Sequence, residues 1–403
     1  MQQKIFPLEG QVQPYNWGGF TFIPQLLGKE ENGRQPSAEY WLGAHPNYPG
    51  FVQAGDVRLS LDRFISLNPE EVLGQDVART FGALPFLLKV LDVRQMLSIQ
   101  VHPSKAAAAA AFADEDKAGI PVSAPHRNYK DRNHKPELMV ALGDFWLLHG
   151  FKAETALLQT LSEVPEFQCL AEAFQNGSYR GLYEKVMLLE PSEVDRMLSP
   201  LVARIRPLYA RGVLPKSSAD FWAARAVETF CQKGQYDRGI FSIYFFNLLH
   251  LRRGEGIYQP AGMPHAYLEG QNVEIMANSD NVLRAGLTDK HIDVPELLKH
   301  TRFEATLPSV LGSAAGTERE TCFQTEAAEF ELRQYRLAAG EELQLQAGSS
   351  EILLALWGSL SVQAGSAQRP LGRGASLFLA AGTPYTVTAG AASELFRATV
   401  PGK

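Results

Sequence analysis

The chain has 403 residues, of which 45% are hydrophobic and 20% charged, so it is long enough for two or three globular domains with sizeable cores. Its formal net charge of -6 argues against nucleic acid or an anionic membrane as a bulk partner, and any bound anion must therefore be held by a local basic cluster. Three cysteines, an odd number without metal-type spacing, favour buried thiols in a reducing compartment.

The apolar segments give no sign of export or of membrane insertion. The first residues contain no apolar core of a signal peptide, and no uninterrupted apolar stretch reaches the length that spans a bilayer. We therefore expect a cytoplasmic protein that binds neither nucleic acid nor a membrane.

The first 60 residues consist of short apolar pieces interrupted by glycine and proline, a pattern typical of antiparallel β structure. Glu39, Trp41 and His45 lie in this part of the chain. They are either site residues or parts of a β-turn corner that packs on aromatic side chains, and the corner is the simpler interpretation.

Residues 85–93 form an almost continuous apolar run, which is typical of a buried strand. Lys89 interrupts this run. Because an unpaired ammonium group in such a place is costly, we expect Lys89 to have a partner or a function.

In the next stretch, residues 97–103, apolar and polar side chains alternate, and the other candidate site residues are judged relative to this stretch. In a strand, side chains two residues apart project from the same face, so Gln100 and His102 lie together. Pro103 then ends the strand because it has no backbone donor. Two polar side chains side by side suit two ligands of one metal ion, although a half-buried strand with one polar face is the commoner meaning of this pattern.

A run of six alanines begins shortly after Ser104 and predicts a helix of roughly three turns with serine as its N-cap. A polar loop follows and leads into a strand that begins at Glu137. Glu137 is either a solvated carboxylate or a site residue, since it follows His134 and Lys135 in a loop rich in polar side chains.

The period of the apolar residues changes between residues 153 and 237. Val194, Leu198, Leu201 and Ile205 recur at steps of four and three, which is the spacing of one helix face. No group of chemically active residues stands out here. We therefore predict a helical insertion that packs against the rest of the chain or covers it.

The β pattern returns at residue 241 and continues to residue 268. Pro260 and Pro264 fix a rigid turn just before His265, so the imidazole leaves a defined point of the backbone. Rigid placement of this kind is what a metal ligand needs.

The small and polar composition of residues 313–327 indicates a linker. Short strands and Ala-Gly turns follow without any histidine, which predicts a second β-sandwich or jelly roll that holds no metal. The chain is therefore expected to be mainly β. Its predicted parts are a β domain with the metal site (residues 1–152 and 238–312), a helical insertion (153–237) and a C-terminal β domain (313–403).

The candidate metal ligands come from three separated stretches, which the fold must bring together. They offer two imidazoles, one carboxylate and one amide, an open set that suits a catalytic Zn²⁺ with room for water or substrate oxygens. Softer metals would prefer thiolate ligands, and no cysteine is near in sequence. The four candidates are Gln100, His102, Glu137 and His265. The remaining histidines are expected at the surface or in the core: His45, His126, His134, His149, His250, His291 and His300.

A second set of residues is basic and consists of Lys89, Lys105, Lys135, Arg284 and Lys290. An acidic protein that keeps cations near metal-type ligands is suited to bind an anion, most simply a phosphate monoester. The alternative for Lys105 and Lys290 is that both are solvated surface charges.

Four stretches contain long and highly specific motifs. They are Pro-Phe-Leu-Leu-Lys and Leu-Ser-Ile-Gln-Val-His-Pro-Ser-Lys within residues 85–105, Asn-Tyr-Lys-Asp-Arg-Asn-His-Lys-Pro-Glu-Leu at 128–138, and residues 38–46 and 260–287. These motifs resemble the type I mannose-6-phosphate isomerases. The likeness runs from Tyr15 to about Leu298 and becomes vague after that.

The resemblance implies a zinc-dependent interconversion of mannose 6-phosphate and fructose 6-phosphate, with one Zn²⁺ per chain. It also implies a jelly-roll catalytic domain of the cupin type with a helical insertion, and a second, cupin-like β domain at the C-terminus. By motif, Gln100, His102, Glu137 and His265 match the zinc ligands of the family, and Arg284 matches its catalytic arginine. Other active-site positions are matched by Ser98, Lys89, Lys135, Tyr267, Glu274 and Asp280.

The mechanism we expect is an aldose-ketose isomerisation through a cis-enediol(ate), in which a base moves a proton between C2 and C1. We predict Lys135 as this base because nearby cations can lower a lysine pKa, and Glu274 and Asp280 are the competing candidates. Arg284 is assigned to charge stabilisation or phosphate anchoring, since a guanidinium stays protonated. Substrate contacts are assigned to Ser98, Lys89, Tyr267 and Lys290.

Two other classes of protein share a cupin fold. A non-catalytic cupin that binds a sugar phosphate would not need both a polarising metal and surplus basic groups. A metal-dependent oxygenase favours a two-histidine, one-carboxylate iron site, so the added Gln100 and the basic set argue against it. The small-molecule substrate is thus expected to be a hexose 6-phosphate, and the chain is expected to act as a monomer.

Overall fold

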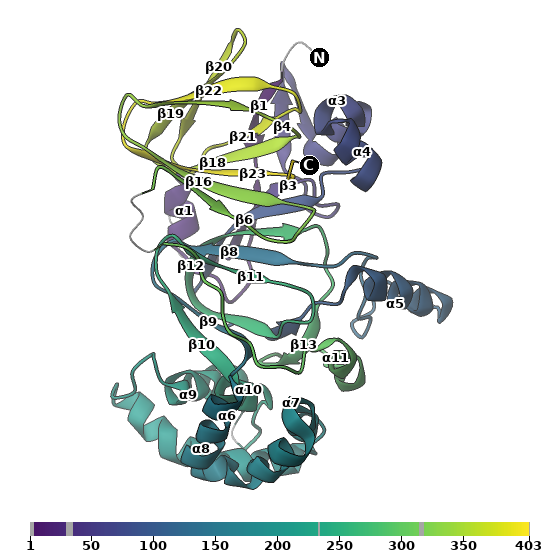
Figure 1. The fold of residues 1–403 in the computed structure, drawn as a ribbon, viewed down its shortest axis with the longest axis vertical. Coiled ribbons are helices and arrows are strands. Elements are labelled where there is room, and N and C mark those ends of the chain that lie inside the picture. The colour runs from purple at the N-terminus through teal and green to yellow at the C-terminus, as the bar shows by residue number, and fades with distance from the viewer. Residues whose placement is uncertain (1–3, 30–34, 233, 314–317, 403) are drawn as a thin grey trace.

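The chain folds into three parts that follow one another along the long axis of the molecule, with a β-sandwich at one end, a second β structure in the middle and helices at the other end (Figure 1). The computed structural model describes residues 4–29, 35–232, 234–313 and 318–402. The expected mainly β fold with helices inserted between strands is confirmed.

The middle part is a sheet of eleven strands organised around one long strand, β12 (His265–Ala277). The first half of β12 pairs with β7 (Ile99–Val101) and β9 (Phe145–Phe151), and its second half pairs with β6 (Phe86–Val93) and β8 (Glu137–Ala141). All these ladders are antiparallel. The other strands are β2 (Gln11–Gln13), β3 (Glu39–Gly43), β10 (Phe246–Leu251), β11 (Glu255–Gln259), β13 (Leu283–Gly286) and β14 (Leu311–Gly312).

Several local predictions for this part are confirmed. The apolar run forms β6, in which every residue is buried. The centre of the alternating stretch forms the short strand β7, which ends one residue before His102. The alanine run forms α5 (Lys105–Lys117), and the Ser104 hydroxyl accepts a hydrogen bond from the Ala107 amide at 3.4 Å, as an N-cap does. The last of the helices, α11 (Val294–His300), follows β13.

The C-terminal strands form a sandwich together with strands from the beginning of the chain. Its larger sheet has the order β15 (Glu320–Phe323), β16 (Glu331–Leu337), β23 (Ser393–Thr399), β18 (Glu351–Trp357), β21 (Ser376–Leu379), β1 (Ile5–Glu9), β4 (Phe51–Ala54) and β5 (Val57–Ser60). Its smaller sheet has the order β17 (Glu342–Gln346), β22 (Pro384–Ala389), β19 (Ser359–Ala364) and β20 (Ala367–Gly372). Ile5, Leu353 and Val387 share the core between the two sheets.

This topology bears on the proposed division of the chain. Strand β1 lies between β21 and β4, so a strand from residues 1–152 is hydrogen-bonded to strands from residues 313–403. A second core, which includes Phe6, Leu88 and Phe396, joins the larger sheet of the sandwich to the middle part. We keep the three-part division as a proposal in which the N-terminal strands complete the C-terminal sandwich.

Short helices in the N-terminal part are α1 (Phe22–Leu26), α2 (Leu61–Leu67), α3 (Pro69–Leu73) and α4 (Gln75–Phe81).

The helical part follows β9 and lies at the far end of the middle sheet (Figure 1). It contains α6 (Glu154–Glu163), η1 (Pro165–Leu170), α7 (Ala171–Met187), α8 (Pro191–Ala210), α9 (Ala219–Phe230) and α10 (Gly239–Phe245). The predicted face of α8, including Leu198 and Leu201, is buried in a core shared with Ile99 of β7. Among the described residues, no helix is long and apolar enough to cross a membrane.

Three sequence-based expectations are wrong. Residues 241–245 belong to α10 and not to a strand, because a short apolar run that is buried on all sides has no periodicity that separates the two states. Residues 320–323 form β15 although they were expected in a linker; of that linker, residues 314–317 lie outside the described residues. Cys169 is exposed, although Cys231 and Cys322 are partly buried and all three thiols are free.

Candidate metal centre

The register of three neighbouring strands places three of the candidate residues side by side. In the antiparallel ladders, Gln100 of β7 lies opposite His265 of β12 on one side and opposite Arg284 of β13 on the other. Residues directly opposite in such a ladder project from the same face, with Cβ atoms roughly 5 Å apart. Arg284, Gln100 and His265 therefore form one row across the sheet, and His102 follows one residue after β7 ends.

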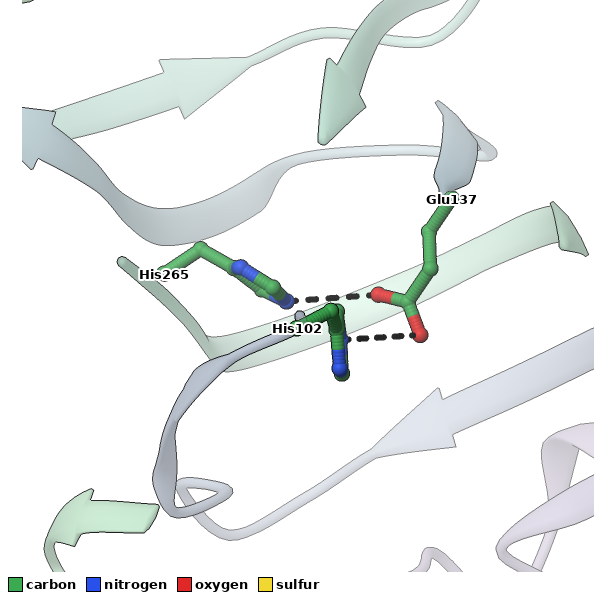
Figure 2. Close-up of side chains that lie close together, drawn as sticks. All are labelled: His102, Glu137 and His265. Carbon is green, nitrogen blue, oxygen red and sulfur yellow. Dashed lines mark ion pairs between the residues drawn. The ribbon is translucent and has the colours of Figure 1, made fainter. Parts of the chain in front are cut away.

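Three of the four predicted ligands converge in space. The ligand atoms of His102, Glu137 and His265 all lie within 4.8 Å of one another, and all three residues are buried. Figure 2 shows both imidazoles directed at the carboxylate, with His102 Nε2 3.5 Å from Glu137 Oε1 and His265 Nε2 3.2 Å from Glu137 Oε2. Two ring nitrogens and a carboxylate from three distant stretches thus face a common point.

The outer nitrogens of both rings fix the tautomer. His102 Nδ1 donates to the backbone oxygen of Asn281 at 2.8 Å, and His265 Nδ1 donates to the backbone oxygen of Met263 at 2.9 Å, because a carbonyl can only accept. The lone pairs of the Nε2 atoms are then directed toward Glu137. This arrangement of an outer hydrogen bond and an inner lone pair is typical of metal-ligating histidines.

The electrostatics of the cluster also suit a cation. His102 Nε2 is buried and has no hydrogen-bond partner in the part of the chain that the structure describes. Burial lowers the pKa of His102 to about 4, so the ring is neutral at neutral pH, as a ligand must be. Burial alone would raise the pKa of Glu137, but the positive charge of Lys135 is the largest of the effects that outweigh it, and this pKa lies well below its usual range.

Lys135 lies at the edge of this cluster. Its Nζ is 3.0 Å from Glu137 Oε1, and its side chain is 12% exposed. The predicted base is thus in contact with a candidate ligand, and a small part of its side chain is exposed. Gln100, the fourth predicted ligand, lies opposite His265 in the ladder. The residues present therefore fit a divalent metal ion of the zinc type, with nitrogen and oxygen donors and no thiolate.

A buried polar row lies along the second half of β12. Glu274 Oε2 is 3.1 Å from Lys89 Nζ, and the hydroxyl of Tyr267 donates to Glu274 Oε1 at 2.9 Å. Lys89 Nζ also lies 3.4 Å from Glu39 Oε2. The expectation that Lys89 has a partner is confirmed. Burial would lower the pKa of Lys89, but Glu39 and Glu274 outweigh it and raise this pKa, while burial raises the pKa of Glu274.

Glu39 and His45 were not assigned to the site from the sequence. Glu39 lies in strand β3 and not in a turn corner, and it accepts a hydrogen bond from the indole of Trp41. His45 Nε2 is 3.3 Å from Asp280 Oδ1. Every residue of β3 is buried, so a charged side chain there needs a partner or a function. The same argument that pointed to Lys89 could therefore have pointed to Glu39.

A cleft of about 1230 Å³ opens beside Asp280, and we call it the Asp280 cleft. Polar and charged side chains line much of its wall, including His45, Lys105, Lys130 and Asp131. Burial would raise the pKa of Asp280, but its contact with His45 outweighs this and lowers the pKa, so the carboxyl is ionised. The cleft is therefore a polar opening that reaches one of the predicted catalytic residues.

The remaining candidates are arranged around Arg284. This residue is partly buried, and burial lowers its pKa. Lys290 is exposed as a whole residue, and partial burial of its ammonium group together with the charge of Arg284 lowers its pKa. Ser98 is partly buried. Within the described ranges, the structure shows no side-chain hydrogen bond or ion pair for Ser98, Arg284 or Lys290.

Asn281 is another residue that sequence reasoning missed. Besides holding His102 through its backbone oxygen, it accepts from the Lys130 amide at 2.7 Å through Oδ1 and donates to the backbone oxygens of Asp131 and Asn133 through Nδ2. Asn281 therefore ties the loop before Lys135 to the segment that carries Asp280. An asparagine in a polar stretch carries no signal of such a role.

A buried histidine-carboxylate cluster on an antiparallel sheet, with an inserted helical part, defines a metal-dependent enzyme of the cupin type. Residues 5–154 match the family model described as "Phosphomannose isomerase type I, catalytic domain". The mannose-6-phosphate isomerase of Escherichia coli K12 is 41% identical over 305 residues, covering 74% of this chain and 75% of that protein. The human mannose-6-phosphate isomerase is 38% identical over 328 residues, covering 74% of each chain.

Solved structures extend the likeness over almost the whole chain. The zinc-bound crystal structure of a mannose 6-phosphate isomerase has a TM-score of 0.88 and 32% identity, and it covers 99% of this chain and 100% of that chain. The Salmonella typhimurium enzyme bound to fructose 6-phosphate and zinc agrees equally well, with a TM-score of 0.88. The chain belongs to the mannose-6-phosphate isomerase family.

Proposed function

We propose that this chain is a zinc-dependent aldose-ketose isomerase that interconverts mannose 6-phosphate and fructose 6-phosphate. The observation that carries the proposal is the convergence of His102, Glu137 and His265 in a chain of this family. A Salmonella typhimurium relative has been solved with fructose 6-phosphate and zinc bound, which supports both the substrate and the metal.

The proposed zinc ligands are His102, Glu137, His265 and Gln100, with one ion per chain. Support comes from the facing ligand atoms of the first three residues and from the ladder position of Gln100. When bound there, zinc supplies Lewis-acid stabilisation of negative charge on the O1 and O2 atoms of the sugar.

The reaction is proposed to pass through a cis-enediol(ate), with Lys135 as the base that takes the proton from C2 and returns it to C1. Lys135 is in contact with a ligand, and its side chain is accessible. Glu274 is a weaker candidate, because one of its oxygens accepts from Tyr267 and the other pairs with Lys89. Asp280 is accessible from its cleft but is paired with His45.

The other site residues are proposed to bind and orient the substrate. Arg284, beside Gln100 in the sheet, stabilises developing negative charge or anchors the phosphate together with Lys290. Lys89 and Tyr267 hold Glu274 in place and present their polar groups toward the sugar, and Ser98 supplies a hydroxyl next to the ligand strand.

The experiment that tests the function is a coupled isomerase assay on the purified chain, with metal analysis and with exchange of the C2 hydrogen into deuterated solvent. We expect zinc, turnover and exchange together. Zinc and hexose phosphate binding without exchange would identify a non-catalytic cupin instead, and full turnover after exhaustive chelation would refute a metal-dependent mechanism. Iron and oxygen consumption would identify an oxygenase.

We further propose that the protein acts as a monomer in the cytoplasm. The three free thiols suit a reducing compartment. Light scattering at several protein concentrations measures the molar mass; a value of about 44 kDa, the mass of the 44.4 kDa chain, is expected, and twice that value would contradict the proposal.

A further inference from the structure

A carboxylate from the C-terminal sandwich reaches the loops around the metal centre. Glu329 lies between β15 and β16, and its Oε1 atom is 2.8 Å from Nε2 of His134 and 3.1 Å from Nζ of Lys105. Lys105 begins α5, and His134 lies in the loop before β8. A single oxygen therefore connects two separate segments of the middle part to the sandwich.

The two partners of Glu329 lie equally far along the chain from two proposed metal ligands. Lys105 follows His102 by three residues, and His134 precedes Glu137 by three residues. Glu329 thus joins the segments that carry two of the three clustered ligand atoms.

The backbone around Glu329 is held firmly. Its neighbours Ala327 and Phe330 are buried in the core that joins the sandwich to the middle sheet. The side chain of Glu329 is itself only 3% exposed. The carboxylate therefore has a fixed position, and the side chains of His134 and Lys105 are held against it.

Stability alone does not account for a charged group at this place. Burial would raise the pKa of Glu329, but contacts with His134 and Lys105 outweigh it and lower the pKa to about 2, so the group is ionised at neutral pH. Its second oxygen, Oε2, is buried and has no hydrogen-bond partner among the residues described. Burying a carboxylate with one oxygen unpaired lowers stability compared with an apolar side chain.

We infer that Glu329 is a positioning residue for the isomerase reaction, through which the C-terminal sandwich contributes to the active site. It orients His134, and thereby the adjacent Lys135, and it holds Lys105 at the wall of the Asp280 cleft. The inference rests on the proposed function, because the reaction it serves is the isomerisation assigned above.

The test is Glu329→Gln in the full chain, which keeps the size of the side chain and removes its charge. We expect kcat to fall about tenfold, since small misplacements of a catalytic group cost this much or more. The KM for mannose 6-phosphate should stay within twofold and zinc per chain should be unchanged. The melting temperature should fall, because the variant loses the ion pairs with His134 and Lys105, so kcat is measured well below it. Glu326→Gln is the matched control, because Glu326 is exposed three residues earlier and should keep the kcat of the unmodified chain.

A second variant, His134→Gln, tests the same route from a partly exposed position. It should lower kcat by no more than Glu329→Gln does, because Glu329 also contacts Lys105. The double variant should lose no more than Glu329→Gln alone, because the His134 contact is already broken there. The inference is overturned if Glu329→Gln or His134→Gln keeps full kcat, if kcat falls only in step with zinc content, or if the two effects multiply. Absence of isomerase activity in the unmodified chain would refute the proposed function instead.

Discussion

Glu274 and Lys89 form a buried ion pair across the ladder between β12 and β6, with Glu274 Oε2 3.1 Å from Lys89 Nζ. Glu39 lies 3.4 Å from the same ammonium group on its other side, so one cation serves two buried carboxylates. Lys89→Met should therefore lower the free energy of unfolding by about 3–5 kcal/mol, because it leaves uncompensated buried charge. Urea unfolding of the zinc-loaded protein measures the change.

The matched control for this variant is Arg79→Met, which removes an exposed ion pair with Asp76 and should leave the unfolding curve in place. The double variant Lys89→Met/Glu274→Gln should recover part of the lost stability, since it removes one of the two orphaned carboxylates. A loss below about 1 kcal/mol in the single variant would contradict the electrostatic account of this pair.

Removal of either clustered imidazole should abolish metal binding. We expect His102→Ala and His265→Ala to be purified with little or no zinc and to lose nearly all turnover, because each ring supplies one ligand nitrogen. Metal analysis by mass spectrometry checks this. His291→Ala, at an exposed position, should keep one zinc per chain. Full zinc content in both ligand variants would show that the ion binds elsewhere.

Two variants determine which residue is the base, because one removes the amine of Lys135 and the other removes the carboxylate of Glu274. Lys135→Met should reduce exchange of the C2 hydrogen by at least about 100-fold, the usual contribution of a general base. Glu274→Gln should retain measurable exchange, because Glu274 is already engaged by Tyr267 and Lys89. If Lys135→Met keeps most of the turnover and Glu274→Gln abolishes it, Glu274 is the base.

Arg284→Lys separates the two uses proposed for this guanidinium. Lysine keeps the charge and loses the planar pair of donors, so a phosphate anchor should show mainly a higher KM. Stabilisation of charge that develops during the reaction should show mainly a lower kcat. We expect the kcat effect to dominate, by about tenfold, since Arg284 lies beside Gln100 in the row that leads to His265. Steady-state kinetics with mannose 6-phosphate provide both constants.

The buried His149 predicts how stability depends on pH. Burial lowers the pKa of His149 to about 4 from an ordinary value of 6.5, and its Nδ1 is 2.8 Å from Gln259 Oε1. Between these two values the unfolded chain binds a proton that the folded chain does not, so stability is lost as pH falls from 6.5 to 4. The total is about 3 kcal/mol, at about 1.4 kcal/mol per pH unit.

The measurement is the free energy of unfolding of the zinc-free protein at several pH values, compared with His149→Gln, which cannot take up this proton. The difference between the two proteins should change with pH in the window from 6.5 to 4 and be constant above it. Parallel curves throughout would mean that His149 takes up its proton over the same pH range in the folded and the unfolded chain.

The sequence predicts features whose cause is local. The alternation around Gln100 and His102 depends only on the period of a strand, and the burial of Lys89 depends only on the apolar residues around it. The helix after Ser104 follows from alanine propensity and an N-cap. In each case a window of about ten residues contains the determining information.

Features that depend on which strands pair could not be predicted in this way. Glu39 reaches Lys89 only because β3 lies beside β6, and Glu329 reaches His134 from 195 positions further along the chain. The apolar residues of α10 fit a buried helix or a buried strand equally well until their neighbours are known. The long motifs indicate the family, which the comparisons confirm, and they predict a ligand set, but they carry no information on these additional contacts.

The place of β1 between β21 and β4 has a consequence for synthesis of the protein. The segment Ile5–Glu9 is translated well before its partner Ser376–Leu379, which lies about 370 positions further along the chain. At roughly 5–20 residues per second, the early segment waits about 20–70 seconds with an open edge, a period in which nascent chains are prone to stick to one another. A circular permutant that joins the two ends and opens the chain in an exposed loop would shorten this delay and should give a higher yield of soluble protein on synthesis.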